Sequence, residues 1–143
     1  MSWDIEAIIA ELIETIAGEI AEFESVDEAG ESLPPSGPFC LVEHLGGPVS
    51  LGNLEDWTIG FRITAGVNRN AMIGEERKAV RGFALRIIEA LRGNVVLADC
   101  AFLVDEAEIG MSGELTFAGQ PFVGCSVVVR YQITEGVVDT IHD

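Results

Sequence analysis

The sequence predicts a single α+β domain over residues 1–143, in which two amphipathic helices cover one face of a mainly antiparallel sheet; a mixed sheet is the alternative. Apolar residues recur at steps of three and four in residues 4–24 and 72–94, which is the helical repeat. Apolar and polar residues alternate in residues 57–66 and 122–134, as in a half-buried strand. A chain of 143 residues is long enough to close one hydrophobic core.

The segment 4–24 predicts the first helix. Its apolar residues form one stripe, and its other face carries glutamates with no lysine or arginine to pair with them. A solvated acidic face explains this pattern; the alternative is a face that meets a basic surface on another subunit. The stripe consists of Ile5, Ile8, Ile9, Leu12, Ile13, Ile16, Ile20 and Phe23, and the acidic face of Glu6, Glu11, Glu14, Glu19 and Glu22.

The chain between the helices predicts a loop and two antiparallel strands. Residues 25–38 hold Gly, Pro and polar residues without a repeat, so we expect a loop there. A strand is expected at 39–45 and a turn rich in Gly, Pro and Asn at 46–56. In the second strand, 57–66, the odd-numbered residues are apolar and face the core, while the other face is solvated or an interface.

The second helix is expected over residues 72–94. Its core-facing stripe is Val80, Phe83, Ala84, Ile87, Ile88 and Leu91. Off this stripe lie the basic residues Arg77, Lys78, Arg81 and Arg86, for which a solvated face is the simplest interpretation. Two or three strands follow: one at 101–109, a short one at 114–118 that Gln120-Pro121 ends, and a long one at 122–134.

The charge distribution divides the chain into three parts. The net charge is −16. Residues 1–61 hold thirteen acidic residues and no Lys or Arg, residues 62–92 hold seven basic residues against three glutamates, and residues 93–143 hold eight acidic residues against Arg130 alone. An acidic chain repels nucleic acid and anionic membrane, so neither is an expected partner. A mimic of nucleic acid is the contrary interpretation, but the basic segment would interrupt its acidic surface.

The sequence contains no constellation typical of catalysis, so we expect neither an enzyme nor a cofactor or metal site. The cysteines Cys40, Cys100 and Cys125 are odd in number, form no CxxC and lie in apolar runs, which favours buried thiols. His44 is a lone strand histidine. Asp105 and Glu106 alternate across a strand, which favours an exposed acidic edge.

Several segments together resemble a known family. The order of elements, the strand WTIGFRITAGVNRN (57–70), the helix end FALRIIEALRGNVV (83–96) and the late strand FVGCSVVVRYQIT (122–134) resemble minor tail proteins of Mu-like myophages and prophages. Those proteins are similar to the tail terminators of long-tailed phages. The resemblance implies a small α+β subunit that forms a hexameric ring on the tail tube, ends tube polymerisation and prepares head joining. It implies a tail tube protein and a head-completion protein as partners, with the subunit in the host cytoplasm during assembly and later in the virion tail.

A ring needs contacts between two different surfaces of each subunit. Our hypothesis is that the basic residues Arg77, Lys78, Arg81 and Arg86 meet an acidic surface of the neighbour, either the first helix through residues such as Glu11 and Glu14 or the segment around Asp105 and Glu106. The alternatives are a head–tail joining subunit and a small acidic adaptor or inhibitor that binds a basic protein. An adaptor is expected to be a monomer or dimer.

Overall fold

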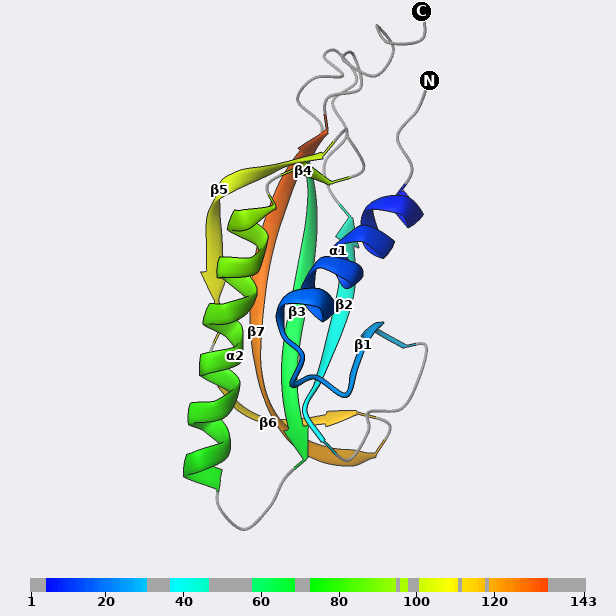
Figure 1. The fold of residues 1–143 in the computed structure, drawn as a ribbon. Helices are drawn as coiled ribbons and strands as arrows, with labels where there is room; N and C mark the ends of the chain where they lie inside the picture. The colour runs from blue at the N-terminus through cyan, green and yellow to red at the C-terminus, as the bar shows by residue number, and fades with distance from the viewer. Residues whose placement is uncertain are drawn as a thin grey trace, which may run out of the picture.

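The computed structural model describes residues 5–30, 37–46, 58–68, 73–94, 96–97, 101–110, 112–117 and 119–133 (Figure 1). Within these ranges the chain forms two helices and seven strands. Their order is α1 (Ile5–Glu19), β1 (Ser25–Glu28), β2 (Phe39–Gly46), β3 (Thr58–Asn68), α2 (Ile73–Gly93), β4 (Val96–Leu97), β5 (Ala101–Ile109), β6 (Gly113–Phe117) and β7 (Gln120–Ile133).

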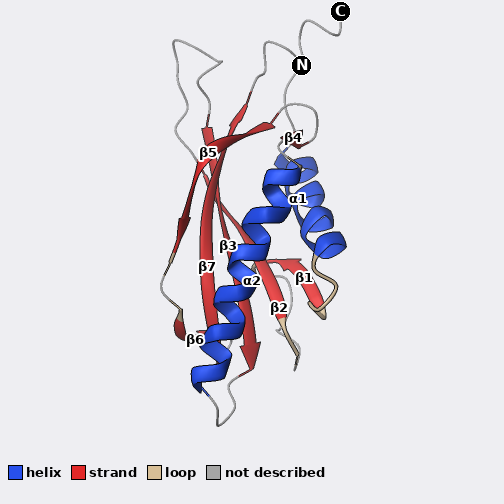
Figure 2. Cartoon of the chain, turned by 60° about the vertical axis from the view of Figure 1, so that its left-hand side comes forward, coloured by secondary structure: helices blue, strands red, loops and turns tan. Residues whose placement is uncertain are grey.

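The strands form one sheet in the order β1-β2-β3-β7-β5-β4, and β6 pairs with β7 beside this path. The pair β1–β2 is parallel and the other pairs are antiparallel. Both helices lie against the same face of the sheet (Figures 1 and 2). The predicted fold class is therefore confirmed: an α+β fold with a mainly antiparallel sheet and two helices on one face.

The main core lies between the helices and this face of the sheet. Each of the three central strands turns alternate apolar residues toward the helices, as the period-two pattern predicts. The buried residues come from both helical stripes and from β2, β3 and β7; they include Ile8, Leu12, Ile16, Val42, Phe61, Ile63, Ala84, Ile87, Leu91, Val127, Val129 and Tyr131. Burial of these side chains, rather than helix propensity, holds the helices in place.

The helix α1 ends at Glu19, earlier than the expected end at residue 24. The chain makes a further turn, in which the Ile20 nitrogen donates to the Ile16 oxygen at 2.9 Å. Ile20 and Phe23 are still buried, so the apolar pattern correctly placed their side chains although the backbone had left the helix. Gly18, which disfavours helix, lies in the last turn.

The expected loop at 25–38 was wrong at its start, because residues 25–28 form the edge strand β1. This strand pairs with β2 in parallel, from Ser25 opposite Phe39 to Glu28 opposite Val42. The Glu24 nitrogen donates to the Pro38 oxygen at 2.7 Å, which joins the two segments just before the pairing starts. A four-residue strand has no readable period, so only its partner identifies it.

The strands β5, β6 and β7 form one long, irregular hairpin. Gln120-Pro121 was expected to separate two strands; instead it begins β7, after a turn in which Gly119 has a φ of 80°. Pro121 pairs with Thr116 of β6, whereas pairing with β3 extends only to Phe122. Pro121 therefore has one strand neighbour, a position where a missing N–H is tolerated. The hairpin tip bends across the end of the sheet (Figure 1).

A second, small core lies on the sheet face away from the helices. Phe39, Leu41 and Phe122 are buried there, and the rings of Phe39 and Phe122 meet edge to face with centroids 5.1 Å apart. Beneath them Gly66 of β3 pairs with Gly124 of β7. A Cβ atom on Gly66 would lie 2.5 Å from Phe39 Cζ, so this pair of glycines makes the depression that the aromatic rings fill.

Candidate interaction surfaces

The residue types that could support catalysis or metal binding are dispersed. In the ranges that the structure describes, no group of three or more His, Cys, Asp or Glu side chains could hold a metal ion. Cys40 and Cys125 are free and buried, and desolvation raises the pKa of both thiols, which makes them weak nucleophiles. Cys100 lies outside the described residues. His44 is exposed, with its ring centroid 5.5 Å from that of Phe61.

None of the helices that the structure describes is long and apolar enough to cross a membrane.

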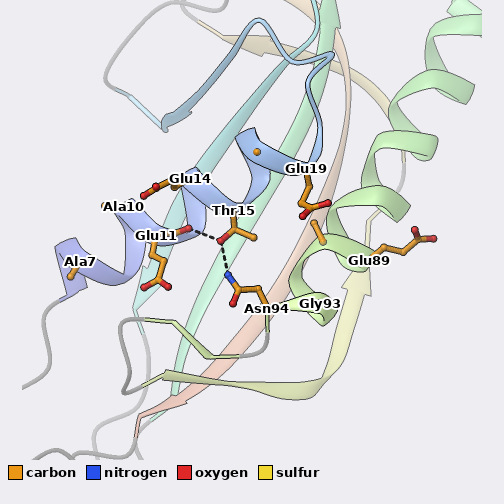
Figure 3. Close-up of a pocket in the computed structure, with 11 residues that line it drawn as sticks. Ala7, Ala10, Glu11, Glu14, Thr15, Glu19, Glu89, Gly93 and Asn94 are labelled. Atoms are coloured by element: carbon orange, nitrogen blue, oxygen red, sulfur yellow. Dashed lines mark hydrogen bonds between the residues drawn. The ribbon is translucent and has the colours of Figure 1, made fainter.

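An open groove runs between α1 and the C-terminal end of α2, and we call it the acidic groove (Figure 3). Its volume is about 980 Å³. Four glutamates border it, three from α1 and one from α2, and the remaining lining is mostly alanine and glycine. The lining residues are Ala7, Ala10, Glu11, Glu14, Thr15, Gly18, Glu19, Glu89, Ala90, Gly93 and Asn94.

A pair of hydrogen bonds fixes the geometry of the acidic groove. The Asn94 Nδ2 atom, just after α2, donates to Thr15 Oγ1 at 2.9 Å, and that hydroxyl donates to the Glu11 carbonyl oxygen at 2.8 Å (Figure 3). The two helices are thus joined by polar groups where small side chains leave open space. Glu11 and Glu14 lie toward one end of the groove, and Glu19 and Glu89 toward the other.

The four basic residues of α2 that were predicted as interface residues divide into two groups. Arg77, Lys78 and Arg81 are exposed on the N-terminal half of the helix, and we call them the basic cluster. In Figures 1 and 2 this half extends past α1, which lies beside the C-terminal half only. Within the cluster Lys78 Nζ is 4.0 Å from the Glu75 carboxylate, an exposed pair that contributes little to stability.

Arg86 is bound within the chain. It makes a bidentate ion pair with Glu22, in which Nη1 and Nη2 lie 2.6 and 3.0 Å from the two carboxylate oxygens. Its guanidinium lies 6.0 Å from the centroid of the Phe83 ring. Phe83 in turn packs on Phe23 at 4.8 Å. Arg86 therefore fastens the chain after α1 to α2, and its predicted role in an intersubunit contact would have to compete with this pair.

The ion pair predicts a measurable pH dependence. The hydrogen bonds from Arg86 hold the pKa of Glu22 below its ordinary value of 4.5. The pair therefore stabilises the fold above pH 4.5, and its contribution is lost as the pH falls through the lowered folded pKa. We expect Glu22→Gln to lower the Tm slightly at pH 7 and by less at pH 3, as measured by calorimetry. A difference in Tm that is the same at both pH values would contradict this.

The predicted interface residues lie in different environments. Glu11 and Glu14 line the acidic groove, and Arg77, Lys78 and Arg81 form the basic cluster. Asp105 and Glu106 belong to β5, where the register with β7 shifts between Leu103 and Ala107; their side chains lie outside the described residues. The predicted alternation of Asp105 and Glu106 across the strand falls at this irregularity and stays a prediction.

The sequence did not identify Glu89 and Asn94 as part of a surface shared with α1. Glu89 lies three residues after Arg86, and the sequence around it has no pattern that indicates a contact with α1. The one available signal was the run of Gly93 and Asn94 after the helical stripe, which marks the helix end but not its contacts. The groove depends on how two distant helices pack, and this is a tertiary property.

Comparison with known proteins shows the fold alone. No protein-family description matches the chain, and no curated protein sequence matches it. Solved structures do match. One of them, whose name states no function, superposes on 90% of this chain and 92% of its own, with a TM-score of 0.60 and 11% sequence identity. The chain is thus similar over nearly its whole length to a protein of the same architecture.

Proposed function

We propose that the protein is a structural subunit of a phage or prophage tail, of the tail terminator type, that assembles as a homo-oligomeric ring on the end of the tail tube. In this role it stops tube polymerisation and prepares the tail for head joining. Its partners are further copies of itself, the tail tube protein and a head-completion protein. The resemblance of residues 57–70, 83–96 and 122–134 to minor tail proteins supports the proposal.

The placement of opposite charges on the two helices carries the proposal: the basic cluster is on α2, and three of the four groove glutamates are on α1. The basic cluster and the acidic groove lie on different parts of the same surface: Lys78 and Ala90 are twelve residues apart on α2, which is about 18 Å along a helix axis. Two complementary patches at different places favour head-to-tail contacts, and such contacts give a ring when the rotation between subunits closes. A two-fold dimer would instead use one self-complementary patch.

The basic cluster predicts a charge-sensitive assembly. We expect Arg81→Glu to raise the Kd of self-association roughly tenfold at low salt, because it replaces an attraction with a repulsion. The effect shrinks at high salt, which screens exposed charges. Arg130→Glu is the matched control: the same change of charge, at an exposed position on β7. Size-exclusion chromatography with light scattering measures both, and equal behaviour of the two variants would reject the charged contact.

A second experiment tests the tail role itself. When the protein is added to polymerising tail tube subunits from the same phage or prophage, capped tubes should be shorter, and electron microscopy should show a ring at one end. Tubes of unchanged length with no bound ring would reject the terminator role. Binding to the head-completion protein without an effect on tube length would favour a head–tail joining subunit.

The acidic groove also favours a second candidate, an acidic adaptor or inhibitor that binds a basic protein. Four glutamates around an open groove suit a cationic segment from any partner. The two functions differ in oligomeric state, since an adaptor needs no self-association. A chain that stays monomeric or dimeric and does not bind tail tubes would support the adaptor.

A further inference from the structure

We infer that the acidic groove of one subunit receives the N-terminal half of α2 from the next copy of the chain, with Arg77, Lys78 and Arg81 among its glutamates. This inference rests on the proposed self-assembly and specifies which surfaces meet. It names one acceptor, the groove between α1 and α2, in place of the two acidic surfaces that the sequence left open.

The shape of the acidic groove suits long cationic side chains. Apart from the glutamates, it is lined mostly by alanines and glycines, and the open volume between the helices is about 980 Å³. Lysine and arginine can lay their aliphatic stems along such small residues and place their charges near the carboxylates. Glu14, Glu19 and Glu89 are exposed, so their carboxylates are accessible to a cation that enters from outside.

The occupant cannot be the basic cluster of the same molecule. On α2 the nearest charged members of the two surfaces, Arg81 and Glu89, are eight residues apart, which is about 12 Å along the helix axis and exceeds the screening length of about 8–10 Å at moderate salt. Arg86 lies between them but is held by Glu22 at 2.6 Å. Arg92 is exposed on the last turn of α2, but it does not line the groove. The exposed carboxylates of Glu14, Glu19 and Glu89 thus remain accessible to another molecule.

A second copy of this chain is the occupant that the charges favour. The basic cluster holds three exposed cations within two turns of α2, on the half that no part of α1 covers. Because this half projects past α1, it can enter a neighbour's groove without moving its own α1. Its cationic face thus complements the four carboxylates in sign, and its projecting end complements the concave groove in shape.

A charge-swap cycle tests the contact on the full-length protein. We expect Arg81→Glu and Glu89→Arg each to weaken self-association roughly five- to tenfold, and the double variant with both changes to recover most of the loss, because it restores an opposite-charge pair across the interface. Glu108→Arg, an exposed position on β5 with the same change of charge, is the control for the other acidic surface. Analytical ultracentrifugation at low salt gives each Kd, and circular dichroism confirms folding.

Each outcome decides between the groove and its alternatives. Recovery in the double variant, with Glu108→Arg unchanged, supports the groove. Any of three results overturns it. Self-association could be weakened by Glu108→Arg but not by Glu89→Arg, the losses could be additive in the double variant, or the wild-type chain could stay monomeric at the highest attainable concentration. Electron microscopy separates this inference from the proposed function. If the subunits form open chains, and the double variant restores them, the groove contact is supported and the closed ring is rejected.

Discussion

Replacing Leu91 with alanine is expected to lower the free energy of unfolding by about 2–5 kcal/mol. Leu91 lies on the last turns of α2, is 1% exposed and packs in the main core. The shorter side chain removes apolar contacts and leaves a cavity, because the sheet beneath cannot collapse into the space. Urea denaturation followed by circular dichroism measures the change through the shifted midpoint at constant slope.

The matched control is the same truncation at Leu85, which is 54% exposed on the same helix. Alanine has the better helix propensity, and little buried area is lost, so Leu85→Ala is expected to change the stability by no more than about 0.5 kcal/mol. A similar loss at both positions would mean that α2 is not packed on the sheet as described. The comparison also checks that the apolar stripe, rather than leucine content, holds the helix.

Elements with a long, strong repeat could be predicted from the sequence. The helix α2 spans Ile73–Gly93 against an expectation of 72–94, and β3 spans Thr58–Asn68 against 57–66. Each of these elements is long and buries one face, so its apolar residues repeat often enough for the period to be recognised. The expected facing of β3 is confirmed as well: Ile59, Phe61 and Ile63 are buried, while Arg62 is exposed and pairs with Glu43 at 3.0 Å.

Elements that depend on a distant partner could not be predicted. The strand β1 has four residues of intermediate burial, and it is defined by its parallel pairing with β2. The bulge between Leu103 and Ala107 and the strand start at Gln120 are set by the register along β7. Local sequence carries little information about such pairings, because the partner's position decides them.

The candidate interaction surfaces could also be predicted only in part. The exposure of Arg77, Lys78 and Arg81 follows from their places off the apolar stripe, so the sequence predicted a basic surface. The pairing of Arg86 with Glu22, 64 positions apart in the chain, does not follow from any spacing, and neither does the groove between α1 and the end of α2. Charge composition predicted that surfaces of opposite sign exist, and packing decided which residues remain available.

Replacing Gly66 with alanine is expected to lower the free energy of unfolding by about 1–3 kcal/mol, the usual range for an overpacked core. The new Cβ atom would lie 2.5 Å from Phe39 Cζ and 3.0 Å from Phe122 Cδ2. Both rings are buried, so they cannot move away without disturbing the small core on this face of the sheet. Gly82→Ala on α2 is the matched control, because apart from its chain neighbours and the backbone of its own helix nothing lies within 4 Å of its Cβ position; it should stabilise the protein by up to about 1 kcal/mol.

The cause of the loss at Gly66 can be tested by removing the side chain that it meets. Phe39→Leu shortens the ring that would clash, so the double variant should lose less stability than the sum of the two single variants, by more than about 0.5 kcal/mol. Strictly additive losses would show that the glycine is needed for another reason, such as backbone freedom in β3. Coupled losses would show that Gly66 makes room for the Phe39 ring, which packs edge to face on Phe122 with the centroids 5.1 Å apart.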